Sequence, residues 1–118
     1  MDRDLGERLL DFAVRIVRLV GQLPASAVGR RIGDQLLRCG TSIGANYEEA
    51  QAAESRGDFT HKMQVALKES REARYWLLLL ARSDVVPAKR LTPLLDEAEQ
   101  IRAMLSKAVA TAKGKAKS

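Results

Sequence analysis

Apolar residues recur at heptad spacing in four separate parts of the chain, and this pattern constrains the fold more than any other feature. In the first part they run from Leu5 to Leu23 at alternating steps of four and three residues, the spacing of one buried helix face. Four amphipathic helices with short connections predict an all-α fold, an antiparallel up-and-down four-helix bundle. The predicted helices cover about 3–22, 27–54, 57–83 and 92–110.

Capping residues and breakers locate the ends of these helices. Ser26 is placed to cap the second helix, and Ser55 begins a capping-box pattern before the third. Thr92 precedes a proline and fits the N-cap of the fourth helix, although a helical turn before that proline also fits. From residue 112 onward the sequence holds only Ala, Lys, Gly and Ser. We therefore predict a bundle over 1–111 and a disordered basic tail over 112–118.

The second predicted helix contains four glycines, Gly29, Gly33, Gly40 and Gly44. Glycine inside a helix costs roughly 1 kcal/mol relative to alanine, so each pair at i and i+4 calls for a compensating contact. For Gly40 and Gly44 we predict close packing against a neighbouring helix or a neighbouring subunit. For Gly29 and Gly33 two interpretations remain open, close packing or a locally weak helix that tertiary contacts stabilise.

Polar residues lie beside the second glycine pair. Ser42, Asn46 and Glu49 recur at helical spacing and are predicted to form one buried or half-buried hydrogen-bonding strip. If Glu69 or Glu72 points inward, it accepts a hydrogen bond from Asn46 or Ser42 and creates a polar layer that fixes helix register. The alternating charges around these two glutamates favour salt-bridged, solvated faces instead.

Composition places the protein in the cytoplasm and gives only a weak indication of its partner. No apolar run is long enough to span a membrane, and the N-terminus lacks the pattern of a secretory signal. A single cysteine cannot form an internal disulfide, which fits a reducing compartment. Lys113, Lys115 and Lys117 supply three of the five net positive charges. A basic balance of this size serves nucleic-acid binding and solubility equally well.

The sequence predicts neither catalysis nor a bound cofactor. Nucleophilic catalysis requires an activated serine or cysteine with a base in reach, and His61 is the only histidine. Cys39 lies on the apolar face of its helix, as a buried structural thiol does. The Glu-x-x-His pattern of metal-binding helical bundles is missing from the sequence. We therefore predict a protein that is not an enzyme and that has no catalytic, cofactor-binding or metal-binding residue.

Several basic residues lie on the second and third helices, which a bundle places side by side. Two interpretations remain open: one positive strip that contacts a nucleic-acid backbone without reading sequence, or scattered charge neutralised by interspersed glutamates. The residues predicted to form this nucleic-acid or partner surface are Arg30, Arg31, Arg38, Arg56, Lys62, Lys68, Arg71 and Arg74.

The last turns of the third helix are apolar on nearly every side. A helix that is apolar all round is buried all round, so this end is predicted either to meet another subunit or to belong to a larger core than usual. The candidate subunit-interface residues are Tyr75, Trp76, Leu78 and Leu79.

A resemblance to a known family rests on short identities in order along the second and third helices. These are Gln35–Tyr47, Glu49–Ala50, Glu54–Arg56, Asp58–Phe59, His61–Lys62, Ala66–Glu69 and Tyr75–Leu77. They resemble the four-helix bundle proteins encoded in intervening sequences of bacterial 23S ribosomal RNA genes. The chain is also similar to the accessory protein of diversity-generating retroelements. Residues at characteristic places of the family, expected to be structural, are Gly40, Ser42, Gly44, Asn46, Glu49, Asp58, Phe59 and Glu69.

The resemblance implies a homopentamer and, by the likeness to the retroelement protein, a basic surface that binds a reverse transcriptase and nucleic acid. The predicted function is thus a non-enzymatic oligomeric accessory or scaffold protein associated with RNA or DNA. The alternative is a protein–protein interaction module with no nucleic-acid role. Nucleic-acid binding weakens steeply with salt, whereas docking through apolar anchors hardly changes.

Overall fold

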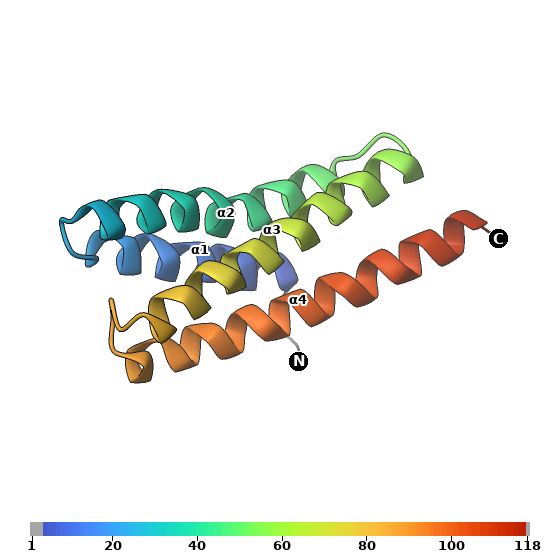
Figure 1. The fold of residues 1–118 in the computed structure, drawn as a ribbon. Coiled ribbons are helices and arrows are strands. Elements are labelled where there is room, and N and C mark those ends of the chain that lie inside the picture. The colour runs from blue at the N-terminus through green and yellow to red at the C-terminus, as the bar shows by residue number, and fades with distance from the viewer. Residues whose placement is uncertain (1–3, 118) are drawn as a thin grey trace.

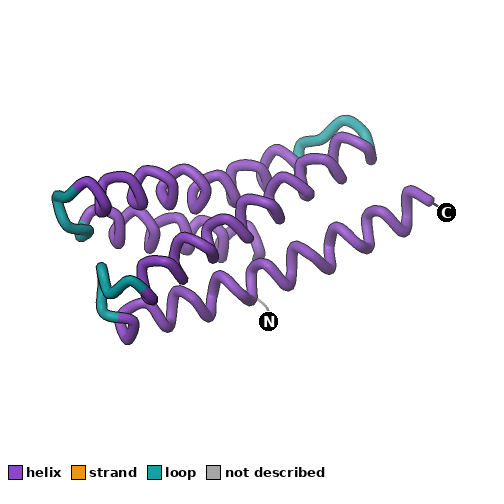
Figure 2. The backbone as a smooth tube through the Cα atoms, viewed as in Figure 1, coloured by secondary structure: helices purple, strands orange, loops and turns teal. Residues whose placement is uncertain are grey.

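Four helices make up the part of the chain that the structure, a computed structural model, describes, which is residues 4–117. They are α1 (Leu5–Gly21), α2 (Ala27–Gln51), α3 (Arg56–Arg82) and α4 (Ala88–Lys117). Short turns connect them, and no strand occurs within these residues (Figures 1 and 2). The all-helical fold predicted from the heptad pattern is confirmed.

The predicted serine caps are present at α2 and α3. The hydroxyl oxygen of Ser26 accepts a hydrogen bond from the backbone N–H of Gly29 at 3.1 Å. Ser55 does the same for the N–H of Asp58 at 3.0 Å. Each bond satisfies one of the backbone donors that a helix start leaves unpaired. At the other end of α3, Asp84 adopts φ 59° in the left-handed region, which turns the chain toward α4.

The heptad positions form the core. Phe12 and Leu9 of α1 are at most 1% exposed, and the matching positions of the other helices close around them. Val28 departs from the pattern: its position, four residues before Ile32, continues the apolar spacing of α2, but it lies in the first turn of that helix and is 53% exposed. The core residues of the remaining helices include Ile32, Leu36, Cys39, Ile43, Met63, Ala66, Ala73, Leu77, Leu80, Leu91, Ile101 and Leu105.

Gly40 and Gly44 bring α2 close to α1, as predicted. A Cβ atom added at Gly40 would lie 2.9 Å from both Cγ1 and Cγ2 of Ile16. At Gly44 the same atom would lie 3.4 Å from Leu9 Cβ and 3.7 Å from the Leu9 backbone oxygen. The close contact is therefore with a neighbouring helix of the same chain, and at Gly44 it involves the backbone of α1.

The first glycine pair is closely packed too, at Gly33 against the end of α1 and the turn that follows it, and at Gly29 against the turn that precedes its own helix. A Cβ atom at Gly29 would lie only 2.1 Å from the backbone oxygen of Pro24. At Gly33 it would lie 3.3 Å from side-chain carbons of Val20 and Leu23. None of the glycines that the structure describes has a positive φ. Space, and not backbone conformation, is what requires glycine at Gly29.

Helix α4 is longer at both ends than the predicted 92–110. It begins at Ala88, so Pro93 lies in its second turn and removes only one backbone donor. The helical turn before this proline, left open by the sequence, is present. The segment 112–118 was predicted to be a disordered tail, but α4 continues to Lys117, and Ser118 lies outside the described residues. Alanine and lysine favour helix, and extending an existing helix is much easier than starting one.

Each helix packs mainly against its neighbours in sequence, and α1 meets α4 only sparsely. Near the start of α1, the guanidinium of Arg8 donates two hydrogen bonds to the Glu97 carboxylate, at 2.6 and 3.1 Å. A third bond reaches Gln100 at 3.2 Å. The C-terminal half of α4 extends past this point toward the turn between α2 and α3 (Figure 1).

Cys39 is predicted to be unreactive in the folded protein. Its thiol is fully buried, and this burial raises its pKa from 9.0 to about 12. At pH 8 the thiolate, which is the nucleophile, is therefore scarce as well as inaccessible. Ellman's reagent at pH 8 should label the protein only after denaturant is added. Rapid labelling without denaturant would contradict this burial.

The raised pKa of Cys39 determines how its contribution to the stability of the fold changes with pH. Because the folded protein holds the thiol proton more tightly than the unfolded chain, this contribution to stability is complete below pH 9 and is lost between about pH 9 and pH 12. The difference in melting temperature between the native chain and a Cys39→Ala variant should shrink over that range.

Candidate nucleic-acid interface

The basic residues predicted to form one strip across α2 and α3 are divided between two sides of α3. Arg38 and Lys62 lie where α2 and α3 meet, and both contact carboxylates across that seam. Lys68, Arg71 and Arg74 belong to hollows that α3 forms with α4. The two sides differ in how much of their positive charge is compensated.

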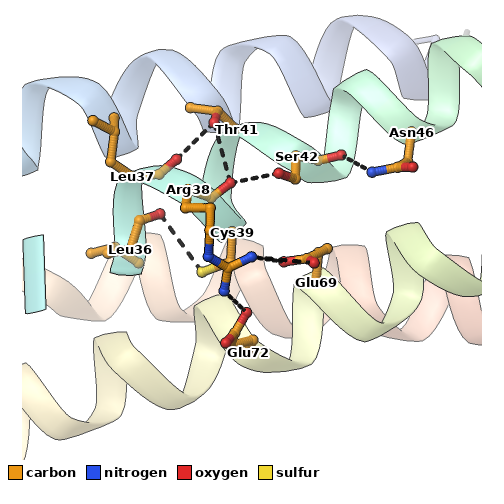
Figure 3. A network of polar contacts seen from close by, with 9 residues as sticks. All are labelled: Leu36, Leu37, Arg38, Cys39, Thr41, Ser42, Asn46, Glu69 and Glu72. Carbon is orange, nitrogen blue, oxygen red and sulfur yellow. Dashed lines mark hydrogen bonds and ion pairs between the residues drawn. The ribbon is translucent and has the colours of Figure 1, made fainter. Parts of the chain in front are cut away.

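On the α2–α3 side, Arg38 is held between two glutamates of α3 (Figure 3). One nitrogen of its guanidinium donates to Glu69 at 3.2 Å, and another donates to Glu72. The hydrogen bond with Glu72 is the main cause of a raised pKa at Arg38. With both glutamates accepting from it, this arginine adds no net positive charge to the seam.

The hydrogen bonds that Ser42 and Asn46 would make if Glu69 or Glu72 pointed inward are not formed, and the favoured alternative, a salt-bridged face, is observed. The Ser42 hydroxyl donates to the backbone oxygen of Arg38 at 2.6 Å, and the Asn46 amide donates to the backbone oxygen of Ser42 at 2.9 Å (Figure 3). Both side chains thus bond within α2, where a carbonyl one turn back is the nearest acceptor. Glu69 and Glu72 accept from Arg38 instead.

Lys62 is also compensated, since its ammonium lies 3.6 Å from a carboxylate oxygen of Glu49. Arg30 and Arg31 are exposed near the start of α2 and do not line the hollows between α3 and α4. Arg56 lies at the start of α3 and lines an apolar hollow of ≈ 840 Å³ between the α2–α3 turn and the end of α4. Phe59 is half-buried in the same hollow.

The α3–α4 side carries a groove made of two adjoining hollows that share Arg71. The first has a volume of ≈ 530 Å³ and the second ≈ 510 Å³. We call the combined surface the α3–α4 groove. Its lining residues are Gln64, Leu67, Lys68, Arg71, Arg74, Tyr75, Leu78, Glu99, Arg102, Ser106, Val109, Ala110 and Lys113.

The charge of the α3–α4 groove is strongly unbalanced. Five of its lining side chains are cationic and only one, Glu99, is a carboxylate. Glu99 lies 3.0 Å from Arg74 and 2.7 Å from Arg102. The hydrogen bond from Arg102 is the main cause of a lowered pKa at Glu99, which therefore stays ionised at neutral pH. Lys68 and Arg71 make no ion pair within residues 4–117, and both are exposed.

Two of the five cations come from α4 and were not among the predicted site residues. Arg102 follows a core position of the heptad pattern, where the sequence predicts an ordinary charged residue on the solvated face of the helix. Lys113 was assigned to the tail, yet α4 carries it to the end of the groove. Arg102 and Lys113 are far from Arg71 along the chain, so the sequence did not indicate that these three residues would share one surface.

The candidate subunit-interface residues at the end of α3 are partly covered within the chain itself. Trp76 and Leu79 pack against the core, and Leu78 is half-buried in the groove. Only Tyr75 is well exposed, at 59%. A larger exposed apolar stripe lies on α1, at Leu10, Val14 and Val17.

Cys39 and His61, the residues considered for nucleophilic catalysis, lie in different surroundings. Cys39 is buried with its thiol facing the backbone oxygen of Leu36, whereas His61 is exposed near the start of α3. Within 4–117 there is no group of three or more His, Cys, Asp or Glu side chains that could hold a metal ion. In the same part of the chain, no helix combines the length and apolar character needed to cross a bilayer.

The model of the 23S rRNA-intervening sequence protein family matches residues 2–107. The chain belongs to the 23S rRNA-intervening sequence protein family. A crystal structure of a protein with unknown function from the S23 ribosomal protein family of Bacteroides thetaiotaomicron is similar to this chain, with 38% sequence identity and a TM-score of 0.84. The match covers 90% of this chain and 98% of that one. No curated protein matches the chain significantly.

Membership confirms the resemblance on which the sequence prediction rested, and the helices of this intervening-sequence protein agree with the fold of the solved relative. The family match ends at residue 107, so Lys113 lies beyond it. Arg102 and the cations of α3 lie within it.

Proposed function

We propose that this protein is a non-enzymatic accessory or scaffold protein that associates with RNA or DNA through the α3–α4 groove. The observation that carries the proposal is the five cationic side chains against one carboxylate in that groove. A polyanion gains the most binding free energy at a surface whose cations are exposed and lack carboxylate partners, because the release of its counterions then drives binding. The compensated α2–α3 seam offers no such gain.

The proposed contact is with the phosphate backbone. Lysine and arginine on a helical surface position a nucleic acid without reading its sequence. The side chains that line the groove run from Gln64 to Leu78 on α3, about 21 Å along the helix axis at 1.5 Å per residue. A groove of this length can contact several consecutive phosphates of one strand.

We further propose that the helices form an antiparallel up-and-down bundle and that cytoplasmic copies of it assemble into a ring-like homo-oligomer, a pentamer by family resemblance. The short turns between consecutive helices support the topology (Figure 2). The exposed stripe of Leu10, Val14 and Val17 on α1 supports the assembly. Several grooves in one ring would raise avidity for a long strand. A reverse transcriptase is a candidate protein partner by the same resemblance.

Removing two groove cations tests the proposal. A Lys68→Ala/Arg71→Ala variant should bind a 20-nucleotide RNA at least tenfold more weakly than the native protein at 50 mM salt. The slope of log K against log salt should fall by about 1.4 for a single strand, because two phosphate contacts are lost. Fluorescence anisotropy over a salt series measures both quantities.

The matched control is Arg30→Ala/Arg31→Ala, which removes the same charge from exposed positions outside the groove. Glu99→Gln supplies the opposite change, since it releases Arg74 and Arg102 and should strengthen binding severalfold. Equal losses in both double variants would indicate a general charge effect and would count against the groove. A native protein that binds no nucleic acid at 50 mM salt would favour the alternative, a protein–protein interaction module.

A further inference from the structure

Tyr75 is the one aromatic side chain, among those in residues 4–117, that is left largely exposed. Phe12 is buried, and Tyr47, Phe59 and Trp76 are half-buried against the core, whereas Tyr75 is 59% exposed. It lies in the α3–α4 groove beside Arg71, Arg74 and Arg102. An exposed ring among three guanidinium groups is not explained by stability of the fold.

The ring of Tyr75 is held in place by its neighbour. Its centroid lies 5.2 Å from that of Trp76, with an angle of 80° between the two ring planes. This edge-to-face packing is a favourable arrangement for two aromatic rings, and Trp76 is itself packed against the core. The ring of Tyr75 is therefore already held in one position, so its side chain loses little conformational freedom when a flat group stacks on it.

A flat aromatic surface between cations suits an unpaired nucleobase. In single-stranded nucleic acid the bases stack on aromatic side chains while basic residues follow the phosphates. In a duplex the faces of the bases are already stacked on one another, so the protein is offered only the backbone and the base edges in the grooves. In a groove that bound only duplex, an exposed tyrosine at the most arginine-rich point would not contribute a stacking contact.

We propose that the α3–α4 groove binds single-stranded nucleic acid, with one unpaired base stacked on Tyr75 and the adjoining phosphates on Arg71, Arg74 and Arg102. This inference rests on the proposed function and narrows it to unpaired strands. It also requires Tyr75 to stay outside the subunit interface, in agreement with placing that interface on α1.

The test compares four 20-nucleotide probes: single-stranded RNA, single-stranded DNA, duplex DNA and an abasic strand that keeps the phosphates. The native protein should bind both base-bearing single strands about tenfold more tightly than the abasic strand. Tyr75→Leu should remove this advantage, leave abasic and duplex binding within twofold of native, and keep the salt slope, because base stacking on aromatic residues contributes little to salt dependence. Tyr75→Phe keeps the ring and should behave as native.

The single tryptophan gives a readout that is independent of affinity. A base stacked on Tyr75 lies close to Trp76, so base-bearing strands should change its fluorescence at saturation and the abasic strand should not. RNA and DNA strands are run side by side, and a stronger effect with one of them identifies the sugar that the groove favours.

The outcomes separate this inference from the proposed function. If base-bearing and abasic strands bind equally and Tyr75→Leu changes neither, stacking is overturned while the basic groove stands. If Tyr75→Leu weakens all four probes alike, Tyr75 has a structural role and the inference fails. If no probe binds the native protein, the proposed function itself is wrong.

Discussion

Gly29→Ala is expected to lower the free energy of unfolding by about 2 kcal/mol, although alanine is the better helix former. The added Cβ would lie 2.1 Å from the backbone oxygen of Pro24, so the turn between α1 and α2 must move. Overpacking of this kind costs typically about 1–3 kcal/mol, and a rigid backbone neighbour places it at the upper end. The gain of roughly 1 kcal/mol in helix propensity offsets only part of that cost.

The matched control is the same substitution at Gly44. There the new Cβ meets Leu9 at 3.4 Å, an ordinary van der Waals distance, so Gly44→Ala should leave stability unchanged or raise it by up to about 1 kcal/mol. For a domain of this size, the expected difference of about 2–3 kcal/mol between the variants corresponds to roughly 10 °C in Tm. Thermal unfolding followed by circular dichroism measures it. Equal Tm values would show that Gly29 is not confined by the turn.

Leu10→Glu/Val17→Glu is expected to convert the proposed oligomer into a monomer of about 13 kDa. Both side chains are more than half exposed on α1, so the substitutions leave the core of a single chain intact. In an interface between subunits, each glutamate would be a charge removed from water without a partner, which is costly. Mass from light scattering, with circular dichroism to confirm helix content, measures the change.

Val28→Glu serves as the control for this double variant. Val28 is 53% exposed, much like Val17, but it lies at the start of α2 and outside the stripe. It should retain the mass of the native protein. A native protein that is itself monomeric would contradict the proposed assembly. A double variant that keeps the native mass would exclude α1 as the interface and return attention to the end of α3.

The sequence predicted the helices and core well because both follow from local patterns. Heptad spacing placed Leu9, Phe12 and Ile16 inside, and the two serine caps follow from side-chain chemistry within one turn. The end of α4 was harder to predict, because Ala-Lys-Gly composition is typical of disordered tails and of a helix that merely continues. The prediction of where α4 starts depended on whether Pro93 lies at the first position of the helix or further inside it.

The candidate site could be predicted only in part, because its location depends on how far each helix is rotated in the bundle. Arg38 and Arg71 are both arginines on solvated faces by sequence, yet one meets two glutamates and the other meets none among the described residues. A rotation of 100° separates adjacent positions on a helix. Heptad spacing identifies the face of a helix that points inward, but it does not show which neighbouring helix a residue beside that face will meet, and for the same reason Arg102 was missed.

The preference of each helix for its sequence neighbours also has a kinetic consequence. Pairing α1 with α2, α2 with α3 and α3 with α4 closes only short loops, so little chain entropy is lost at each step, and bundles rich in local contacts fold fast. The bond between Arg8 and Glu97 is different, because it joins residues 89 positions apart. We expect the chain to fold neighbour upon neighbour, with the link between its first and last helices made at the end.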